Sequence, residues 1–180
     1  LKLLSGFENP NYGQVFIHGL DMEKRRRETR QLIGYVPHEN DLDPWLTLEQ
    51  NIRFTANLYR VDEETAIRRM AMFAEALNLV PYLNEFASRA SHGIQKKTML
   101  VRELVHDPDV LILDEPTSAL GRAVQEQMIT LLTELQKKHG LAYLFISHDL
   151  KVVRALSDEI IVMREGEVVE YGTASRVLQN

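Results

Sequence analysis

A four-residue apolar run in the second half of the chain places the strongest limit on how the chain can fold. Residues 110–113 read Val-Leu-Ile-Leu, with Pro108 before them and Pro116 after them. Such a run predicts a short strand that is buried on both faces, as in a parallel sheet. Asp114 and Glu115 follow directly, at the carboxyl end of the strand, where open α/β sheets bind ligands. An ordinary strand followed by an acidic turn is the alternative explanation of this run by itself.

Composition narrows the class of protein. With 180 residues, 44% hydrophobic and 26% charged, the chain is long enough for one globular domain with a core. No apolar run approaches the roughly 20 residues of a membrane-spanning helix, so we expect a soluble protein. The absence of cysteine excludes disulfides and thiolate metal sites. A net charge of −5 argues against nucleic-acid binding, and the basic run 24–27, flanked by Glu23 and Glu28, is expected to be a solvated helix face.

The first residues resemble the end of a helix. Leu1–Leu4 is followed by Gly6, a typical residue after a helix C-terminus. The first residue is leucine rather than methionine, so we expect the chain to be a fragment.

Alternating strand and helix patterns predict an α/β fold with a mostly parallel sheet. Strands are expected at Gly13–Gly19, Leu32–Val36 and Ala142–Ile146 (the last a buried strand), with a hairpin formed by residues 160–163 and 168–171. Helices are expected from Thr47 to Tyr59, where Thr47 and Gln50 form a capping box, and at residues 62–77, 95–106, 122–138 and from about 175. Residues 47–106 thus form a helical block, and residues 107–180 form the second part of the α/β core. Trp45 belongs either to the core or to a contact surface.

A histidine follows a second buried strand. Because the carboxyl ends of parallel strands lie at one edge of a sheet, His148 is expected to converge with Asp114 and Glu115. His18, His106 and His139 have no such position and are expected to be structural.

Four motifs, in order and at matching intervals, resemble those of ATP-binding cassette (ABC) transporter ATPases. Residues 111–118 (LILDEPTS) resemble the Walker B motif and the start of the D-loop, and residues 145–149 (FISHD) resemble the switch-histidine loop. Residues 33–38 lie at the Q-loop position, and residues 90–94 lie at the position of the LSGGQ signature. The resemblance covers essentially the whole chain. It implies a single nucleotide-binding domain at 1–180 with a P-loop NTPase-like sheet and an inserted helical subdomain, without the N-terminal strands and the P-loop.

The resemblance also implies roles for individual residues. An acid at the position of Asp114 holds Mg²⁺, usually through water, which suits the preference of this ion for oxygen ligands. A glutamate at the position of Glu115 orients and deprotonates the water that attacks the γ-phosphate of ATP, and an imidazole at the position of His148 contacts that phosphate. His38, Ser91 and Gly93 fall on nucleotide-binding positions. The implied cofactors are ATP and Mg²⁺.

The sequence departs from the family pattern in the loops that contact nucleotide. It contains no G-x-x-x-x-G-K-[ST], and therefore lacks the lysine, the nest of backbone N–H groups and the hydroxyl of a phosphate loop. The adenine-stacking aromatic of the family is absent as well.

Four substitutions add to this departure. His38 stands where the family has glutamine, and an imidazole nitrogen is a poorer ligand for Mg²⁺ than an amide oxygen. His92 stands in place of the first signature glycine, Ile94 in place of the signature glutamine, and Gly121 in place of the D-loop aspartate. Harmless family variation is one explanation; a weakened nucleotide site is the other, and it is the one we expect.

The expected function is that of an ATP-binding and ATP-hydrolysing subunit that energises transport across a membrane. Its partners would be transmembrane permease subunits and a second ATP-binding domain, with no nucleic acid, at the cytoplasmic face of a membrane. Residues 125–172 are most similar to peptide importers and residues 39–51 to exporters. A degenerate, non-catalytic ABC module is the alternative function. Coupling to ribosomes or DNA repair is a third, which the acidic charge balance disfavours.

Overall fold

The computed structural model describes residues 3–6, 8, 10–118 and 120–179, and only the backbone of residue 139. The chain forms two compact units, residues 1–146 and residues 147–180. Residues 1 and 2 of the expected N-terminal helix end and the side chain of His139 lie outside the described part. The division into residues 47–106 and 107–180 stays a prediction.

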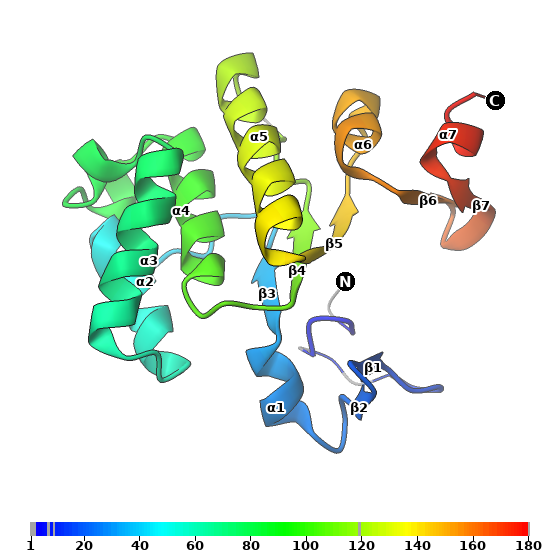
Figure 1. Ribbon diagram of the computed structural model, residues 1–180, viewed down its shortest axis with the longest axis horizontal. Coiled ribbons are helices and arrows are strands. Elements are labelled where there is room, and N and C mark those ends of the chain that lie inside the picture. Colours follow the sequence, from blue (N-terminus) through cyan, green and yellow to red (C-terminus); the bar gives the residue numbers. More distant parts are fainter. Residues whose placement is uncertain (1–2, 7, 9, 119, 180) are drawn as a thin grey trace. The chain divides into compact units, whose positions relative to one another are not determined.

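A three-stranded parallel sheet forms the centre of the first unit (Figure 1). Its strands are β3 (Ile33–Val36), β4 (Val110–Asp114) and β5 (Ala142–Ile146), and β4 lies between the other two. The backbone of β4 is therefore hydrogen-bonded on both sides, and Leu111–Leu113 are fully buried, as the apolar run predicts. The predicted α/β class and parallel sheet are confirmed.

Three helices between β3 and β4 form a cluster beside the sheet (Figure 1). They are α2 (Leu48–Leu58), α3 (Glu63–Ala76) and α4 (His92–Leu104), and α4 packs against α2, α3 and β3. The predicted capping box of Thr47 and Gln50 is present, with both of its hydrogen bonds, and Asp62 caps α3. Two 3₁₀ turns, Val80–Tyr82 and Ala87–Arg89, connect α3 to α4.

The helix that follows β4 carries the predicted apolar stripe. Helix α5 (Arg122–His139) buries Met128, Leu131, Leu132 and Leu135. The hydroxyl of Tyr143 in β5 donates to the carbonyl oxygen of Leu132 at 2.7 Å, which fixes α5 against the sheet. Gly140 ends α5 with φ 64°, a left-handed conformation that favours glycine.

Polar side chains of α4 close the open edge of β3. Because β3 is an edge strand of the sheet, one side of its backbone has no strand partner among the described residues. The Glu103 carboxylate accepts from the Tyr35 N–H at 3.1 Å, and the Nε2 of His106, two residues beyond α4, lies 3.2 Å from the Ile33 carbonyl oxygen. A Cβ on Gly34 would lie 2.7 Å from Leu111 Cδ1 and 3.2 Å from the backbone oxygen of Glu103, so this close approach requires glycine.

The N-terminal segment of the first unit differs from its prediction. The strand expected at Gly13–Gly19 is reduced to β1 (Phe16–Ile17), which pairs with β2 (Leu20–Asp21) in a tight hairpin. His18 and Gly19 both have positive φ, as a two-residue hairpin turn requires, so Gly19 belongs to the turn and not to the strand. Helix α1 (Arg26–Gln31) follows and contains part of the basic run.

The second unit contains α6 (Leu150–Leu156), the antiparallel strands β6 (Glu159–Arg164) and β7 (Glu167–Thr173), and α7 (Ala174–Val177). The predicted hairpin and short C-terminal helix are confirmed, whereas α6 was not predicted. No helix among the described residues is long and apolar enough to cross a membrane.

Two further predictions were wrong in detail, and one open alternative is decided. Helix α4 begins at His92 rather than Gln95, because Ser91 is its N-cap. Leu144 and Ile146 of β5 are exposed, so this strand is not fully buried. Of the two alternatives left open for Trp45, the core is excluded, because its side chain is 83% exposed.

His106 is structural, as predicted, and is held in its neutral form. Its ring stacks on Tyr59, with ring centroids 3.9 Å apart, and its buried Nδ1 has no hydrogen-bond partner within the described structure. Burial lowers the pKa of His106 from 6.5 to about 4, because a proton on Nδ1 would place a charge away from water.

We expect His106 to make stability depend on pH between about 4 and 6.5. In this range the unfolded chain binds a proton at His106 that the folded chain does not, so stability falls as the pH falls. Between pH 7.5 and 4.5 the loss is about 2–3 kcal/mol. Urea unfolding of the His106→Phe variant should show a loss smaller by this amount, whereas the exposed control His18→Gln should behave as the unchanged chain does. Equal losses for both variants would contradict this explanation.

Candidate functional site

The parallel register brings the ends of β3 and β4 together. Val36 pairs with Leu113, so the residues that follow each strand are neighbours. His38, two residues after β3, has its Nδ1 3.6 Å from Oε2 of Glu115, the first residue after β4. Two of the predicted site residues therefore meet at the expected edge of the sheet.

Glu115 has an unusual backbone conformation. Its φ is 47°, in the left-handed region that a side chain with a Cβ rarely adopts. Its N–H donates to the Ile146 carbonyl oxygen at 3.0 Å, and its carbonyl oxygen accepts from the N–H and the hydroxyl of Ser118. These hydrogen bonds hold the strained residue in place. Strain of this kind is often found at functional sites, and here it falls on the predicted catalytic acid.

Asp114, the last residue of β4, is half-buried, and its charge acts on the phenol of Tyr35. The pKa of Tyr35 is raised by burial and, to a lesser extent, by the negative charges of Asp114 and Asp41. The carboxylate of Asp114 therefore contributes to a negative potential at the carboxyl edge of the sheet.

The side chains at this edge of the sheet can hold Mg²⁺ only if waters and substrate phosphates supply most of its ligands. Among the described residues, no three His, Asp or Glu side chains are grouped as a metal site. Mg²⁺ in proteins commonly keeps several waters and takes one or two carboxylates together with substrate phosphates. Asp114 suits such a site, whereas the imidazole of His38, which faces Glu115, suits Mg²⁺ poorly.

Ser91 and Gly93 lie at the start of α4, on a different element from Glu115. Ser91 is exposed, and its hydroxyl accepts from the Ile94 N–H at 3.4 Å. A Cβ on Gly93 would come no closer than 3.8 Å to another residue, the side chain of Leu120, so packing within the chain does not require glycine here. Both residues remain available to a ligand or a partner at this helix end.

His148 belongs to the second unit. It is exposed and directly precedes Asp149, whose side chain accepts from the Lys151 N–H and caps α6. Its expected convergence with Glu115 stays a prediction.

One residue of this region, Lys96, was missed by sequence reasoning. Its side chain is fully buried, and burial lowers its pKa, whereas the charges of Asp114, Asp41 and Glu115 act in the opposite direction. Lys96 therefore lies within electrostatic reach of both predicted acids. Lysine in a helix is usually exposed, so no sequence pattern indicated that Lys96 is buried.

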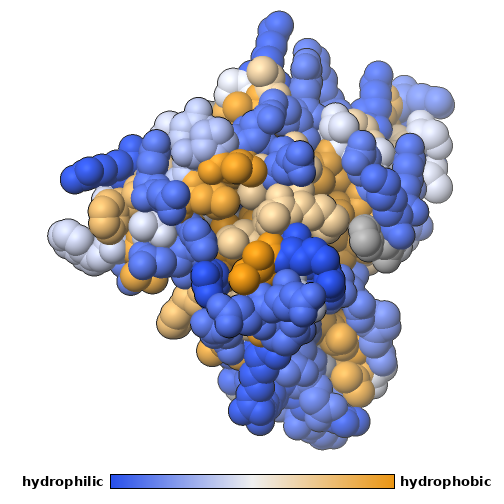
Figure 2. Space-filling view, turned by 60° about the vertical axis from the view of Figure 1, so that its left-hand side comes forward, coloured by the Kyte–Doolittle hydropathy of each residue, from blue (hydrophilic) through white to orange (hydrophobic). Residues whose placement is uncertain are grey.

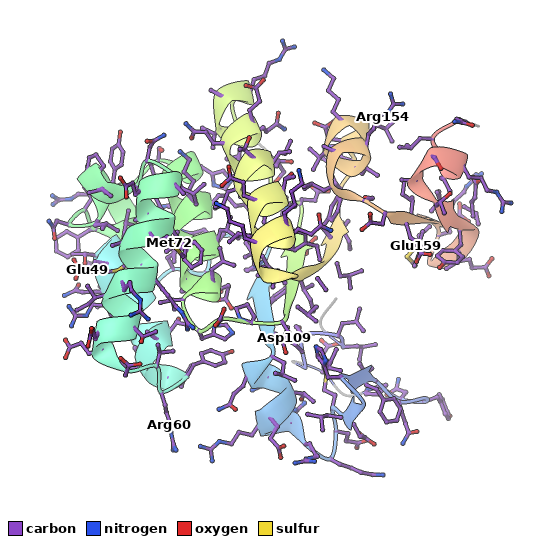
Figure 3. All side chains as sticks on the ribbon, viewed as in Figure 1. Glu49, Arg60, Met72, Asp109, Arg154 and Glu159 are labelled. Carbon is purple, nitrogen blue, oxygen red and sulfur yellow. The ribbon has the colours of Figure 1, made fainter. Side chains whose placement is uncertain are left out.

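A pocket of about 500 Å³ lies at the other end of the sheet and is a weaker candidate. It is lined by residues around Asp109, which directly precedes β4, and by Met72 of α3 (Figure 3). Its charged groups pair with one another: Arg69 with Asp107 at 2.5 Å and His18 with Asp109 at 3.4 Å. The carboxyl edge of the sheet, with its strained acid, is the better candidate.

The strain at Glu115 predicts how stability responds to substitution. Glycine relieves a left-handed conformation and alanine does not, so Glu115→Gly should be more stable than Glu115→Ala by about 1 kcal/mol. Chemical denaturation of both variants measures this difference.

Glu165 provides a matched control, because it is an exposed glutamate in a hairpin turn with φ 52°. Its Gly and Ala variants should differ in the same direction. Equal stability of the two variants at Glu115 would show that this backbone is not strained.

Comparison with solved structures supports the fold. The chain aligns with an ATP-binding subunit of an ABC transporter at a TM-score of 0.88 and 25% identity, over 99% of this chain and 74% of that one. It also aligns with the ATP-binding cassette MJ0796 bound to ADP and Pi, at a TM-score of 0.87 and 24% identity, over 96% of this chain and 78% of that one. At these identities the second alignment shows the fold alone.

Sequence relatives are subunits of the same kind. The chain is 32% identical over 177 residues to an Fe(3+) ions import ATP-binding protein, FbpC 1, of Haemophilus influenzae, over 98% of this chain and 54% of the relative. It is 34% identical over 183 residues to the spermidine/putrescine import ATP-binding protein PotA of Photobacterium profundum, over 99% of this chain and 48% of the relative. It is 51% identical over 154 residues to the uncharacterized ABC transporter ATP-binding protein YejF of Escherichia coli, over 84% of this chain and 29% of the relative. The chain thus spans about half the length of the first two relatives and less of the third.

The family model described as ABC transporter matches residues 1–118, which include both acids at the end of β4. Taken with the relatives that align along nearly the whole chain, this match means that the chain belongs to the ABC transporter family of ATP-binding proteins.

Proposed function

We propose that this chain is an ATP-binding and ATP-hydrolysing unit that energises transport of a substrate across a membrane. The observation that carries the proposal is the position of Glu115, which directly follows the central buried strand and is held in a strained turn. The import ATP-binding proteins among its relatives favour import as the direction.

The chemistry assigned to the edge of the sheet is phosphoryl transfer to water. Catalysis of this reaction rests on positioning and charge stabilisation, with little covalent work for the protein. Glu115 would orient the attacking water and accept its proton, and Asp114 would hold Mg²⁺ through water. Mg²⁺, when bound with ATP, supplies positive charge to the phosphate oxygens. The carboxylate of Glu115, 28% exposed, is open to water at this edge.

This site differs from the family pattern in having His38, whose imidazole lies close to Glu115. An imidazole in this place lies 3.6 Å from one carboxylate oxygen and, when protonated, forms an ion pair with it. We infer that His38 holds the Glu115 side chain in one orientation and restrains it as a base. His148, by its position after β5, would contact the γ-phosphate.

The partners we propose are a permease and a second ATP-binding domain. Large apolar side chains are exposed on and around the helical cluster, and apolar surface is visible on the side that carries it (Figure 2). Exposed apolar side chains that form a contiguous patch commonly mark sites of protein contact. The exposed side chains here are Trp45, Phe54, Leu58, Ile67, Met72, Val80 and Phe86. A permease that docks here would place the protein at the cytoplasmic face of a membrane, and Ser91 and Gly93 would serve the nucleotide of the second domain.

A direct test replaces each acid singly and measures ATP hydrolysis by the protein assembled with its membrane partners. Glu115→Gln should lower the rate of Mg-ATP hydrolysis at least about 100-fold, because general-base catalysis commonly contributes this much. Asp114→Asn should also abolish most of the activity, by weakening the hold on Mg²⁺.

Asp109→Asn is the matched control, since Asp109 directly precedes the same strand at its other end. It should retain activity within about twofold, as surface changes away from a site usually do. Full activity in Glu115→Gln would refute the catalytic assignment.

The 180-residue chain by itself should bind Mg-ATP weakly. It contains no G-x-x-x-x-G-K-[ST] loop, and a single lost preorganised donor already costs a rate factor of about 10²–10³ in other enzymes. Isothermal titration calorimetry of this chain should therefore give a dissociation constant above about 1 mM, corresponding to less than about 4 kcal/mol of binding free energy. A micromolar value would overturn this expectation.

A non-catalytic ABC module is the second candidate function. The approach of His38 to Glu115 favours it, because it places an imidazole beside the carboxylate that catalysis needs free. His92 and Ile94, which depart from the signature pattern, point the same way. In this case ATP hydrolysis by the assembled complex would not change in Glu115→Gln, since the active site would belong to the partner.

A further inference from the structure

Lys96 lies in the middle of α4 with its side chain fully buried. Its Nζ donates to the Pro37 carbonyl oxygen at 2.9 Å and to the His38 carbonyl oxygen at 2.6 Å. A buried ammonium group is costly unless it is hydrogen-bonded, so these two bonds are strongly favoured. They join residues 58 and 59 positions apart in the sequence.

The two carbonyl groups belong to the loop that carries His38 to Glu115. The His38 backbone is held by Lys96, and the His38 ring lies 3.6 Å from the Glu115 carboxylate. Lys96 is thus linked to the predicted catalytic acid through a single residue. With the backbone of His38 fixed, only its two side-chain torsions decide whether the imidazole stays beside the carboxylate.

Other side chains of α4 hold the same segment on either side. Glu103 accepts from the Tyr35 N–H at 3.1 Å, and Arg102 pairs with Asp41 at 2.9 Å. Arg102 also donates to Glu103 at 2.9 Å, which joins these two anchors. Lys96 holds residues 37 and 38, which lie between Tyr35 and Asp41 in the sequence. These two residues are the part of the segment nearest to the acids.

Lys97, the next residue of α4, has a purely structural role and provides a comparison. Lys97 is also buried, and its Nζ donates to the Leu77 carbonyl oxygen and to Oε1 of Gln127, both at 2.8 Å. It therefore joins α4 to the end of α3 and to α5, away from the site. Burial alone lowers the pKa of Lys97, whereas Lys96 also interacts with Asp114, Asp41 and Glu115.

We propose that Lys96 is a positioning residue of the site: it fixes the backbone of Pro37 and His38 and thereby holds the His38 imidazole against the Glu115 carboxylate. A role of Lys96 in catalysis rests on the proposed function, whereas the contact between His38 and Glu115 can be tested without nucleotide. It makes α4, which begins at Ser91, the element that sets the orientation of Glu115.

The test is a double-mutant cycle read by NMR on the 180-residue chain. Glu115→Gln should shift the His38 ring carbon–proton cross-peaks, because it alters the group that the imidazole contacts. In the Lys96→Met background this shift should fall to less than about half, since a pairwise coupling disappears when the contact is lost. In the Lys97→Met background, which loses a buried ammonium of the same kind, the shift should keep its full size. An unchanged shift in Lys96→Met would overturn the proposal, as would an equal loss in both backgrounds.

A second measurement covers the case in which Lys96→Met does not fold. In the chain with both lysines intact, the buried Nζ resonances can be observed directly, and His38→Ala and Glu115→Gln should shift that of Lys96 but not that of Lys97. A Lys96 resonance that ignores both changes would overturn the proposal. Failure of the proposed function would instead appear as normal ATP hydrolysis in Glu115→Gln, whatever these spectra show.

Discussion

The structure depends on how the open edge of β3 is satisfied. An edge strand exposes backbone donors and acceptors that cost free energy if they are buried without partners. Here α4 and the residues just after it supply the partners from side chains: Glu103 for the Tyr35 N–H and His106 for the Ile33 carbonyl oxygen. These hydrogen bonds keep α4 packed against the sheet although its buried face carries charged residues. An apolar helix would ordinarily occupy such a core position.

This arrangement joins the helical cluster to the chemistry of the sheet. The helix that closes the edge of β3 also anchors the loop after it, through Lys96, and that loop brings His38 to Glu115. Polar networks of this kind are costly when any member is unsatisfied, so each bond favours the others. The geometry around Glu115 is consequently set by α4 as much as by β4.

Much of the fold could be predicted from local sequence signals. Periodicity predicts the strand at Val110–Leu113 and the apolar stripe of α5, and side-chain hydrogen bonding predicts the helix start at Thr47. The failures have equally local reasons. The turn at His18 and Gly19 shortened a predicted strand, and the N-cap at Ser91 started α4 earlier than its apolar residues indicated. Of the site, the two acids were predicted from their place at the carboxyl edge of a parallel sheet, whereas His38 was predicted only from the resemblance of residues 33–38 to a Q-loop.

The sequence by itself determined the family, the strand that carries the acids and the edge at which they lie, since these follow from residue types and their spacing. Only the tertiary structure decided that Glu115 is strained, that His38 faces it and that Lys96 is buried beneath the loop. The last two depend on atoms brought together across 77 and 58 positions of the chain, and the strained turn at Glu115 depends on a hydrogen bond to Ile146, 31 positions away. Contacts at such separation are selected by the packing of the whole helical cluster on β3, and no local pattern of residues encodes them.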